Sequence, residues 1–207
     1  MPDAPTQRNL PQFTEPYVHK SYEPKNTKRP GTMADWTAFV GRVAQLCEAL
    51  YRDARVLRQK RAEAVAPTSG PVTRAEAERN FTATLKRASD HAKELALEFL
   101  ATGMSREHIE NHLELAGTEH DRRPELPIAL LYSKLMGIEF EEERQVVEKD
   151  ANGQEVTTRK VERKKYRWAM ELKASEVDDL YNTMRPLGEA LPLLATKFRS
   201  GTARLPA

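Results

Sequence analysis

Apolar residues recur every three or four positions over most of the chain, which is the spacing of amphipathic helices. Thr73 and Glu76 have the spacing of a capping box at the start of the second helix, and Pro186 is expected to end the fifth. The sequence therefore predicts a mainly α fold, a helical bundle with helices over about residues 33–64, 73–102, 105–117, 126–136, 175–185 and 187–198.

Residues 138–168 follow a different pattern, which predicts one long protruding β-hairpin. Asn152 and Gly153 accept the positive φ of a tight turn, and β-branched valines lie on both sides of it. The first arm is acidic and the second is basic, so opposite charges face each other and help to fix the strand pairing. Apolar residues then alternate from Trp168 to Leu172, which suggests that the second strand continues into the body.

The predicted hairpin has too little apolar surface to be buried in a core. Its only strongly apolar side chains between Glu141 and Lys165 are four valines, so neither face can be covered along its whole length. An isolated two-stranded ribbon is marginal in water, so a partner is expected to stabilise it. The alternative is that the hairpin is a solvated surface insertion without a function. The expected partner contacts are Val146, Val147, Val156 and Val161.

Residues 1–31 form an extended, proline-rich N-terminal arm that blocks regular helix and sheet. Phe13, Tyr17 and Tyr22 are spaced along it among basic residues, as anchors that enter pockets on a neighbouring surface would be. A disordered tail is the alternative. The expected organisation is an arm over 1–31, a helical body over 32–137, the hairpin over 138–168 and C-terminal helices over 169–207 that pack on the body.

Composition limits the function further. The 207 residues are 39% hydrophobic and 31% charged, with a net charge of +2, which argues against wholesale binding of a polyanion. A single cysteine, Cys47, excludes an internal disulfide and suits a cytoplasmic setting or the inside of a particle. No apolar run is long enough for a membrane span, and the N-terminus lacks the apolar segment of a secretory signal.

Local basic patches keep a nucleic-acid interface open as an alternative. The basic strand of the hairpin provides cations for phosphates and flanking aromatic rings that can stack on bases. The residues of this alternative interface are Arg159, Lys160, Arg163, Lys164, Lys165, Tyr166, Arg167 and Trp168.

Two weaker patterns occur near residue 105. The junction at Gly103 resembles the helix-turn-helix signature, but the bulky Phe99 stands where a small residue is normal, and the next helix carries three glutamates. His108 and His112 share a helix face, as metal ligands of a hydrolase can, but lack the glutamate of the zinc-protease motif. Two solvated histidines are the commoner explanation.

No phosphate loop, nucleophile elbow or catalytic pair is recognisable, so neither an enzyme, a cofactor nor a small-molecule substrate is expected. The N-terminal arm and the hairpin cannot fold by themselves, and both are attached to a body of modest size. This organisation favours a structural or adaptor subunit. We expect it to join protein neighbours through its arm and hairpin, as a homo-oligomer or within a multi-subunit complex, with no membrane partner. Virion-like and nucleoprotein particles are built in this way, an analogy at the level of the fold.

Overall fold

The computed structural model describes residues 28–65, 70–104, 128–149 and 154–203. This part of the chain is mostly helical and has one two-stranded antiparallel sheet, which agrees with the predicted class. The elements are α1 (Met33–Val65), α2 (Pro71–Ala101), α4 (Ile128–Met136), β1 (Phe140–Lys149), β2 (Glu155–Lys164), the 3₁₀ turn η2 (Ala174–Glu176) and α5 (Val177–Arg199).

Several predictions concern residues outside these ranges. They are the aromatic anchors Phe13, Tyr17 and Tyr22, the helix over 105–117 with His108 and His112, most of the helix-turn-helix junction, and the hairpin turn at Asn152 and Gly153.

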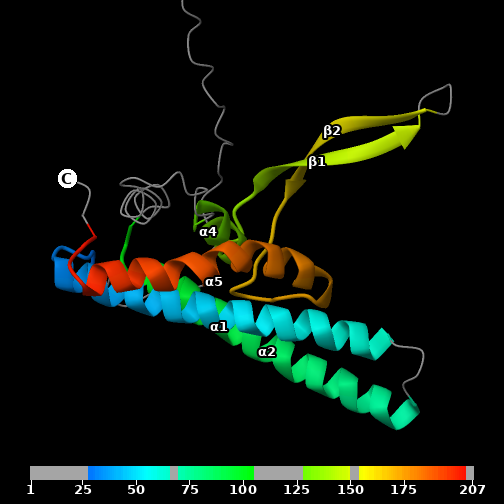
Figure 1. Ribbon diagram of the computed structural model, residues 1–207, viewed down its shortest axis with the longest axis horizontal. Coiled ribbons are helices and arrows are strands. Elements are labelled where there is room, and N and C mark those ends of the chain that lie inside the picture. Colours follow the sequence, from blue (N-terminus) through cyan, green and yellow to red (C-terminus); the bar gives the residue numbers. More distant parts are fainter. Residues whose placement is uncertain (1–27, 66–69, 105–127, 150–153, 204–207) are drawn as a thin grey trace, which may run out of the picture.

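Helices α1, α2 and α5 lie side by side along the long axis of the molecule, and the short α4 lies across them (Figure 1). The predicted stripe of α1 is the centre of this body, because its apolar residues from Trp36 to Leu57 are buried at the three- and four-residue spacing of one helix face. Trp36, Phe39, Phe99 and Tyr132 form a chain of edge-to-face ring contacts that joins α1, α2 and α4.

The predicted capping box of α2 is wrong. The helix begins at Pro71, with Gly70 as its N-cap, and the Thr73 hydroxyl donates back to the Gly70 carbonyl at 2.8 Å. Proline is pre-organised for the first helical position and needs no N–H there, so the helix starts two residues earlier than Thr73.

The break predicted at Pro186 is also wrong, because α5 is one helix that continues through Pro186 and Pro192. A proline inside a helix costs roughly 3 kcal/mol, whereas each fully buried Leu or Phe side chain contributes about 1.5–3 kcal/mol. Ten residues of α5 are buried, so packing outweighs both prolines. The helix is preceded by η2, where the Glu176 carboxylate accepts from the Lys173 N–H at 3.1 Å.

Polar contacts fix how α1 meets its two neighbours. The buried Asp53 carboxylate of α1 accepts from Arg87 and lies 2.8 Å from the His91 Nδ1, both on α2. At the α5 side, Arg58 and Arg61 pair with Asp178, and Arg58 also lies 4.3 Å from the centre of the Tyr181 ring. These two arginines therefore join α1 to the start of α5.

The second strand does not continue into the body, which corrects the expectation from the alternation after Trp168. Residues 167–170 form a turn instead, in which the N–H groups of Met170 and Glu171 both donate to the Arg167 carbonyl, at 2.9 and 2.8 Å. Trp168 and Leu172 are nevertheless buried, and the Trp168 N–H donates to the Lys134 carbonyl of α4.

Candidate assembly interface

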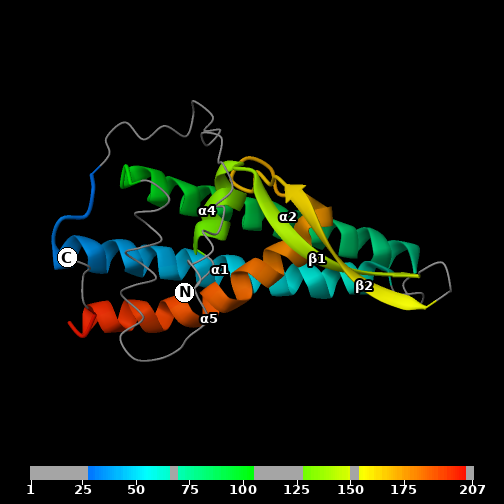
Figure 2. The ribbon, with the colours of Figure 1, turned by 90° about the horizontal axis from the view of Figure 1, so that it is seen from above.

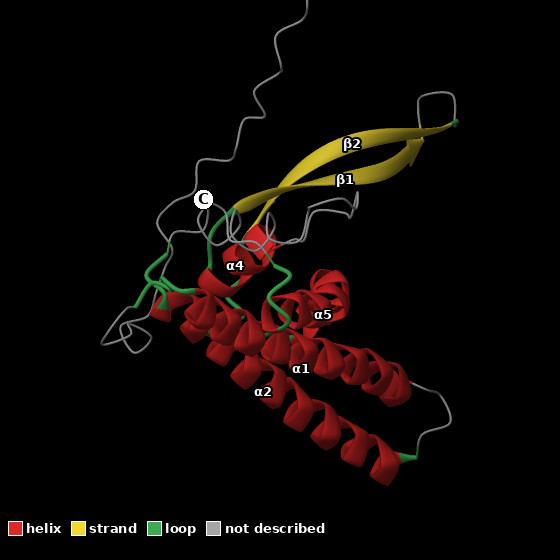
Figure 3. Cartoon of the chain, turned by 60° about the vertical axis from the view of Figure 1, so that its left-hand side comes forward, coloured by secondary structure: helices red, strands yellow, loops and turns green. Residues whose placement is uncertain are grey.

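The hairpin extends away from the helices, and its turn end lies furthest from them in two views (Figures 1 and 3). Figure 2 shows the same ribbon from above, crossing over the helical layer. Its strands pair antiparallel over ten residues each, from Phe140 opposite Lys164 to Lys149 opposite Glu155. The predicted strand pairing is thus present.

Opposite charges meet across the strands in part, as the sequence predicted, although Glu142 lies directly opposite Glu162 and Arg144 directly opposite Lys160. Strand β1 has four glutamates and two basic residues, whereas β2 has four basic residues and two glutamates. Their cross-strand ion pairs are Glu141 with Arg163, Glu142 with Lys164, and Glu148 with Lys160. The hydrogen bond that the Lys164 amine donates to the Glu142 carboxylate raises the pKa of Lys164.

The valines remain largely exposed. Val147, Val156 and Val161 expose 59%, 44% and 58% of their surface, and Val146 is half-buried. All four belong to the two strands and are no part of the body's core cluster. This apolar surface can be covered only by something outside the described part of the chain.

The base of the hairpin, in contrast, is fixed to the body around Lys134 of α4. The Lys134 ammonium lies 5.4, 5.1 and 5.2 Å from the ring centres of Phe140, Tyr166 and Trp168, and donates to the Thr183 hydroxyl of α5 at 2.8 Å. These residues, which we call the root, come from α4, both hairpin ends and α5. Rings around a desolvated cation stabilise it through their negative faces.

The root is almost dry. Lys134 is 2% exposed, and burial lowers the pKa of its amine, with Asp179 and Glu142 opposing that shift. Burial also raises the pKa of the Tyr166 hydroxyl, aided by a hydrogen bond with Asp179. Two main-chain bonds complete the attachment, from the Trp168 N–H to the Lys134 carbonyl at 3.1 Å and from the Ala169 N–H to the Leu135 carbonyl at 3.3 Å.

The sequence analysis predicted neither the root nor the contacts of Asp53 with Arg87 and His91. Lys134 is the only charged residue in the apolar helix IALLYSKLM, and that isolation was the available signal. A charge in such a helix is expected to have partners, but its partners are 6 to 49 residues distant in the sequence. Hydrophobic periodicity relates residues that are close in the sequence, so it could not predict these contacts.

The structure divides the residues of the nucleic-acid alternative into two groups. Tyr166 and Trp168 are buried in the root, so in this conformation their rings cannot stack on bases. The cations remain at the surface, and three of those on β2 have glutamate partners across the hairpin. Lys165 and Arg167 are exposed just beyond the strand.

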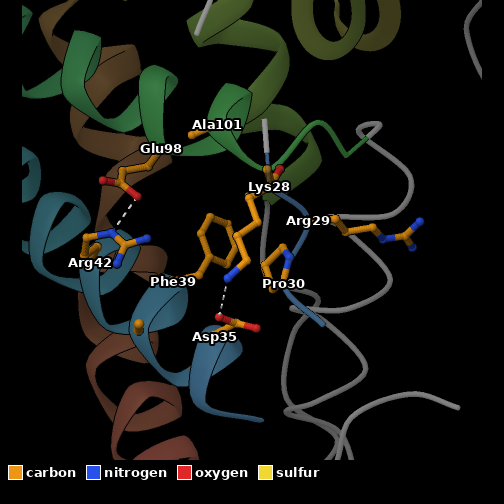
Figure 4. A pocket seen from close by; sticks show the side chains of 10 residues that line it. Lys28, Arg29, Pro30, Asp35, Phe39, Arg42, Glu98 and Ala101 are labelled. Carbon is orange, nitrogen blue, oxygen red and sulfur yellow. Dashed lines mark hydrogen bonds and ion pairs between the residues drawn. The ribbon is translucent and has the colours of Figure 1, made fainter. Parts of the chain in front are cut away.

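A separate pocket of about 270 Å³ lies where residues 28–30 meet α1 and the end of α2 (Figure 4). Four of its five charged side chains form pairs, Lys28 with Asp35 at 3.4 Å and Arg42 with Glu98 at 2.7 Å. The Lys28 N–H donates to the Ala101 carbonyl at 2.8 Å. The last residues of the expected arm are therefore attached to the body.

Comparison with known protein families, curated proteins and solved structures gives no match for this chain. None of the helices in the described ranges has the length and apolar character needed to cross a membrane. In the same ranges, no three His, Cys, Asp or Glu side chains are grouped so as to hold a metal ion.

Proposed function

We propose that the protein is a structural or adaptor subunit of a larger assembly, and that its hairpin is the element that engages a neighbour. The observation that carries this proposal is the contrast along the hairpin. Its base is held by the buried root around Lys134, whereas Val147 and Val156 near the turn end, and Val161 nearer the base, are exposed. A ribbon that is fixed at one end and exposes valines beyond it can present the same surface to every partner.

Energetics support an external partner. A two-stranded ribbon is marginally stable in water by itself, and surface ion pairs such as that of Arg163 with Glu141 contribute only about 0–1 kcal/mol each. Covering the exposed valines would add apolar burial at about 25 cal/mol per Å². The N-terminal arm, with Phe13, Tyr17 and Tyr22, is proposed as a second contact.

The alternative, a nucleic-acid-binding accessory protein that uses the basic strand, has less support. Three cations of β2 have glutamate partners, and the two candidate stacking rings are buried. Binding to DNA or RNA that weakens steeply with salt, and that is lost when Arg163, Lys164 and Lys165 are replaced by Glu, would favour this alternative.

Shortening the hairpin tests the proposal. Residues 145–160 are replaced by a short turn, which leaves the root and its main-chain bonds in place. The thermal stability of the body is expected to stay the same, and the mass of the assembly, measured by light scattering with candidate partners, is expected to fall. A shortened chain that assembles as well as the parent would contradict the proposal. Deleting residues 1–27, which spares Lys28 and its bond to Ala101, tests the arm separately.

A further inference from the structure

Both long edges of the hairpin are free, since β1 and β2 are the only strands of the sheet in the described part of the chain. A free edge presents a row of unpaired main-chain N–H and C=O groups, to which another strand can bind. The strand it accepts depends on the direction of those groups and on the order of the side chains along the edge.

The direction follows from one hydrogen bond. The Val146 carbonyl accepts from the hydroxyl of Thr158, its partner across the hairpin, at 3.3 Å, so the main chain of Val146 faces β2. Successive residues of a strand direct their main-chain groups to opposite edges. Gln145 and Val147 therefore present their N–H and C=O groups to the outer edge of β1.

We infer that the outer edge of β1 pairs antiparallel with the same edge of a second copy of this chain, on a two-fold axis at Val146. This inference rests on the proposed function and names the partner. In this register Gln145 of each copy lies opposite Val147 of the other, and their outward main-chain groups can bond. The two Val146 residues meet where side chains approach most closely.

The order of charges along β1 suits this register. The strand reads Glu143, Arg144, Gln145, Val146, Val147, Glu148, Lys149, so that charges at equal distances from Val146 have opposite signs. Glu143 of one copy falls opposite Lys149 of the other, and Arg144 falls opposite Glu148. The axis repeats both, giving four opposite-charge pairs and no like-charge pair between residues 143 and 149, and such pairs stabilise neighbouring strands.

The other edge does not have this property. Arg159 and Lys160 occupy the middle of β2, so a two-fold axis there would bring cations of the two copies together. Pairing β1 of one copy with β2 of the next would place successive bodies about 10 Å apart, two strand spacings, which is about the width of one helix. The body has three long helices and does not fit within that spacing. The β1 pairing avoids this overlap, because it places the two bodies at opposite ends of one four-stranded sheet.

Charge reversal at two positions tests the pairing in the full-length chain. Arg144→Glu and Glu148→Arg each put like charges opposite each other in the homodimer, and each is expected to weaken self-association by about tenfold or more. The double variant R144E/E148R restores the opposite charges and should dimerise again. Mixing the two single variants should give a heterodimer, because every contact between them is then of opposite sign. Analytical ultracentrifugation at several concentrations measures all four cases.

A matched control separates this effect from the contacts within one hairpin. Lys160→Ala removes the pair of Lys160 with Glu148 inside the chain and leaves the sequence of β1 unchanged, so dimerisation should stay near the parent value. Single variants that dimerise as tightly as the parent, or that fail to associate when mixed, would overturn the inference. A parent chain that stays monomeric at high concentration would also overturn it.

Oxidative cross-linking provides a second measurement. Val146→Cys places two thiols on the axis, where strand partners lie within reach of a disulfide, so a cross-linked dimer should form at low protein concentration. Val161→Cys, which is more exposed than Val146 but lies on β2, should not cross-link in this way. Cys47 is fully buried, and burial raises its pKa, so it stays silent in both variants.

The outcomes distinguish the inference from the proposed function. If the shortened hairpin impairs assembly but the charge variants change nothing, the hairpin binds a different partner and only the inference fails. If the shortened chain assembles as well as the parent, the proposed function itself fails.

Discussion

At the scale of residues, the distance between α1 and α5 depends on a glycine that faces an aromatic ring. A Cβ atom at Gly188 would lie 2.7 Å from the Cβ of Tyr51, closer than packed side chains allow. The Tyr51 ring is itself held against Tyr181, with 5.8 Å between the ring centres. Neither helix can move aside without disturbing the core on both sides of this contact.

Gly188→Ala is therefore expected to destabilise the protein by about 1–3 kcal/mol through overpacking. Gly41→Ala is the matched control, because Gly41 also lies inside a helix but has nothing within 4 Å of an added Cβ. That change should stabilise the protein by roughly 0.5–1 kcal/mol, the helix propensity of Ala over Gly. Chemical denaturation measures both, and equal effects of the two substitutions would contradict the packing argument.

A second prediction concerns the start of α1 and acid. The Asp35 carboxylate accepts from the Thr32 hydroxyl and from the N–H groups of Gly31 and Thr32, which lowers its pKa to about 2. The unfolded chain takes up the same proton near pH 4. The stabilisation by this cap is therefore complete above about pH 4 and is lost as the pH falls towards 2.

Asp35→Asn should remove that part of the acid sensitivity. Thermal unfolding at a series of pH values between 5 and 2 compares the two proteins, and the difference between their melting temperatures should shrink as the pH falls. Parallel curves over this range would show that the cap does not hold the carboxylate as described.

At the scale of elements, the sequence pattern predicted those features that are determined by residues close together in the chain. The stripe of α1 and the paired strands of the hairpin follow from spacing and from charges in the two arms. The predictions at Pro186 and after Trp168 failed because distant contacts decide them. Helix α5 continues through its prolines where its apolar face packs on α1, and the Trp168 segment turns where α4 offers two carbonyl groups.

The root is the element-scale feature with the clearest consequence. Lys134→Ala would leave a space between three rings and remove the partner of the Thr183 hydroxyl, so a loss of about 2–4 kcal/mol is expected. Lys134→Met removes the same partner but keeps most of the volume and removes a buried charge, so it should cost clearly less than Lys134→Ala. Equal losses for Ala and Met, measured by chemical denaturation, would show that filling the root does not matter.

The pH dependence gives an independent readout of the same site. Burial lowers the pKa of Lys134, so the unfolded chain binds this proton more tightly than the native chain does. The free energy of unfolding should therefore increase as the pH rises from the native pKa of Lys134 towards the usual lysine value. The Lys134→Met variant should lack this increase.

At the scale of the whole molecule, the hairpin is fixed to the body at the root and exposed along the rest of its length. Amide hydrogen exchange can measure how protection changes from the root to the exposed strands. In the dilute chain, the amides of Trp168 and Ala169 at the root should exchange slowly, because they bond to α4 carbonyls in the interior. Those of Gln145 and Val147 should exchange quickly, since their N–H groups face the open edge of β1. At high concentration these two amides should become protected while the root stays unchanged, and the Arg144→Glu variant should lose the protection. If protection instead rose uniformly along both strands, or appeared on the outer edge of β2, the second copy would not be bound along β1.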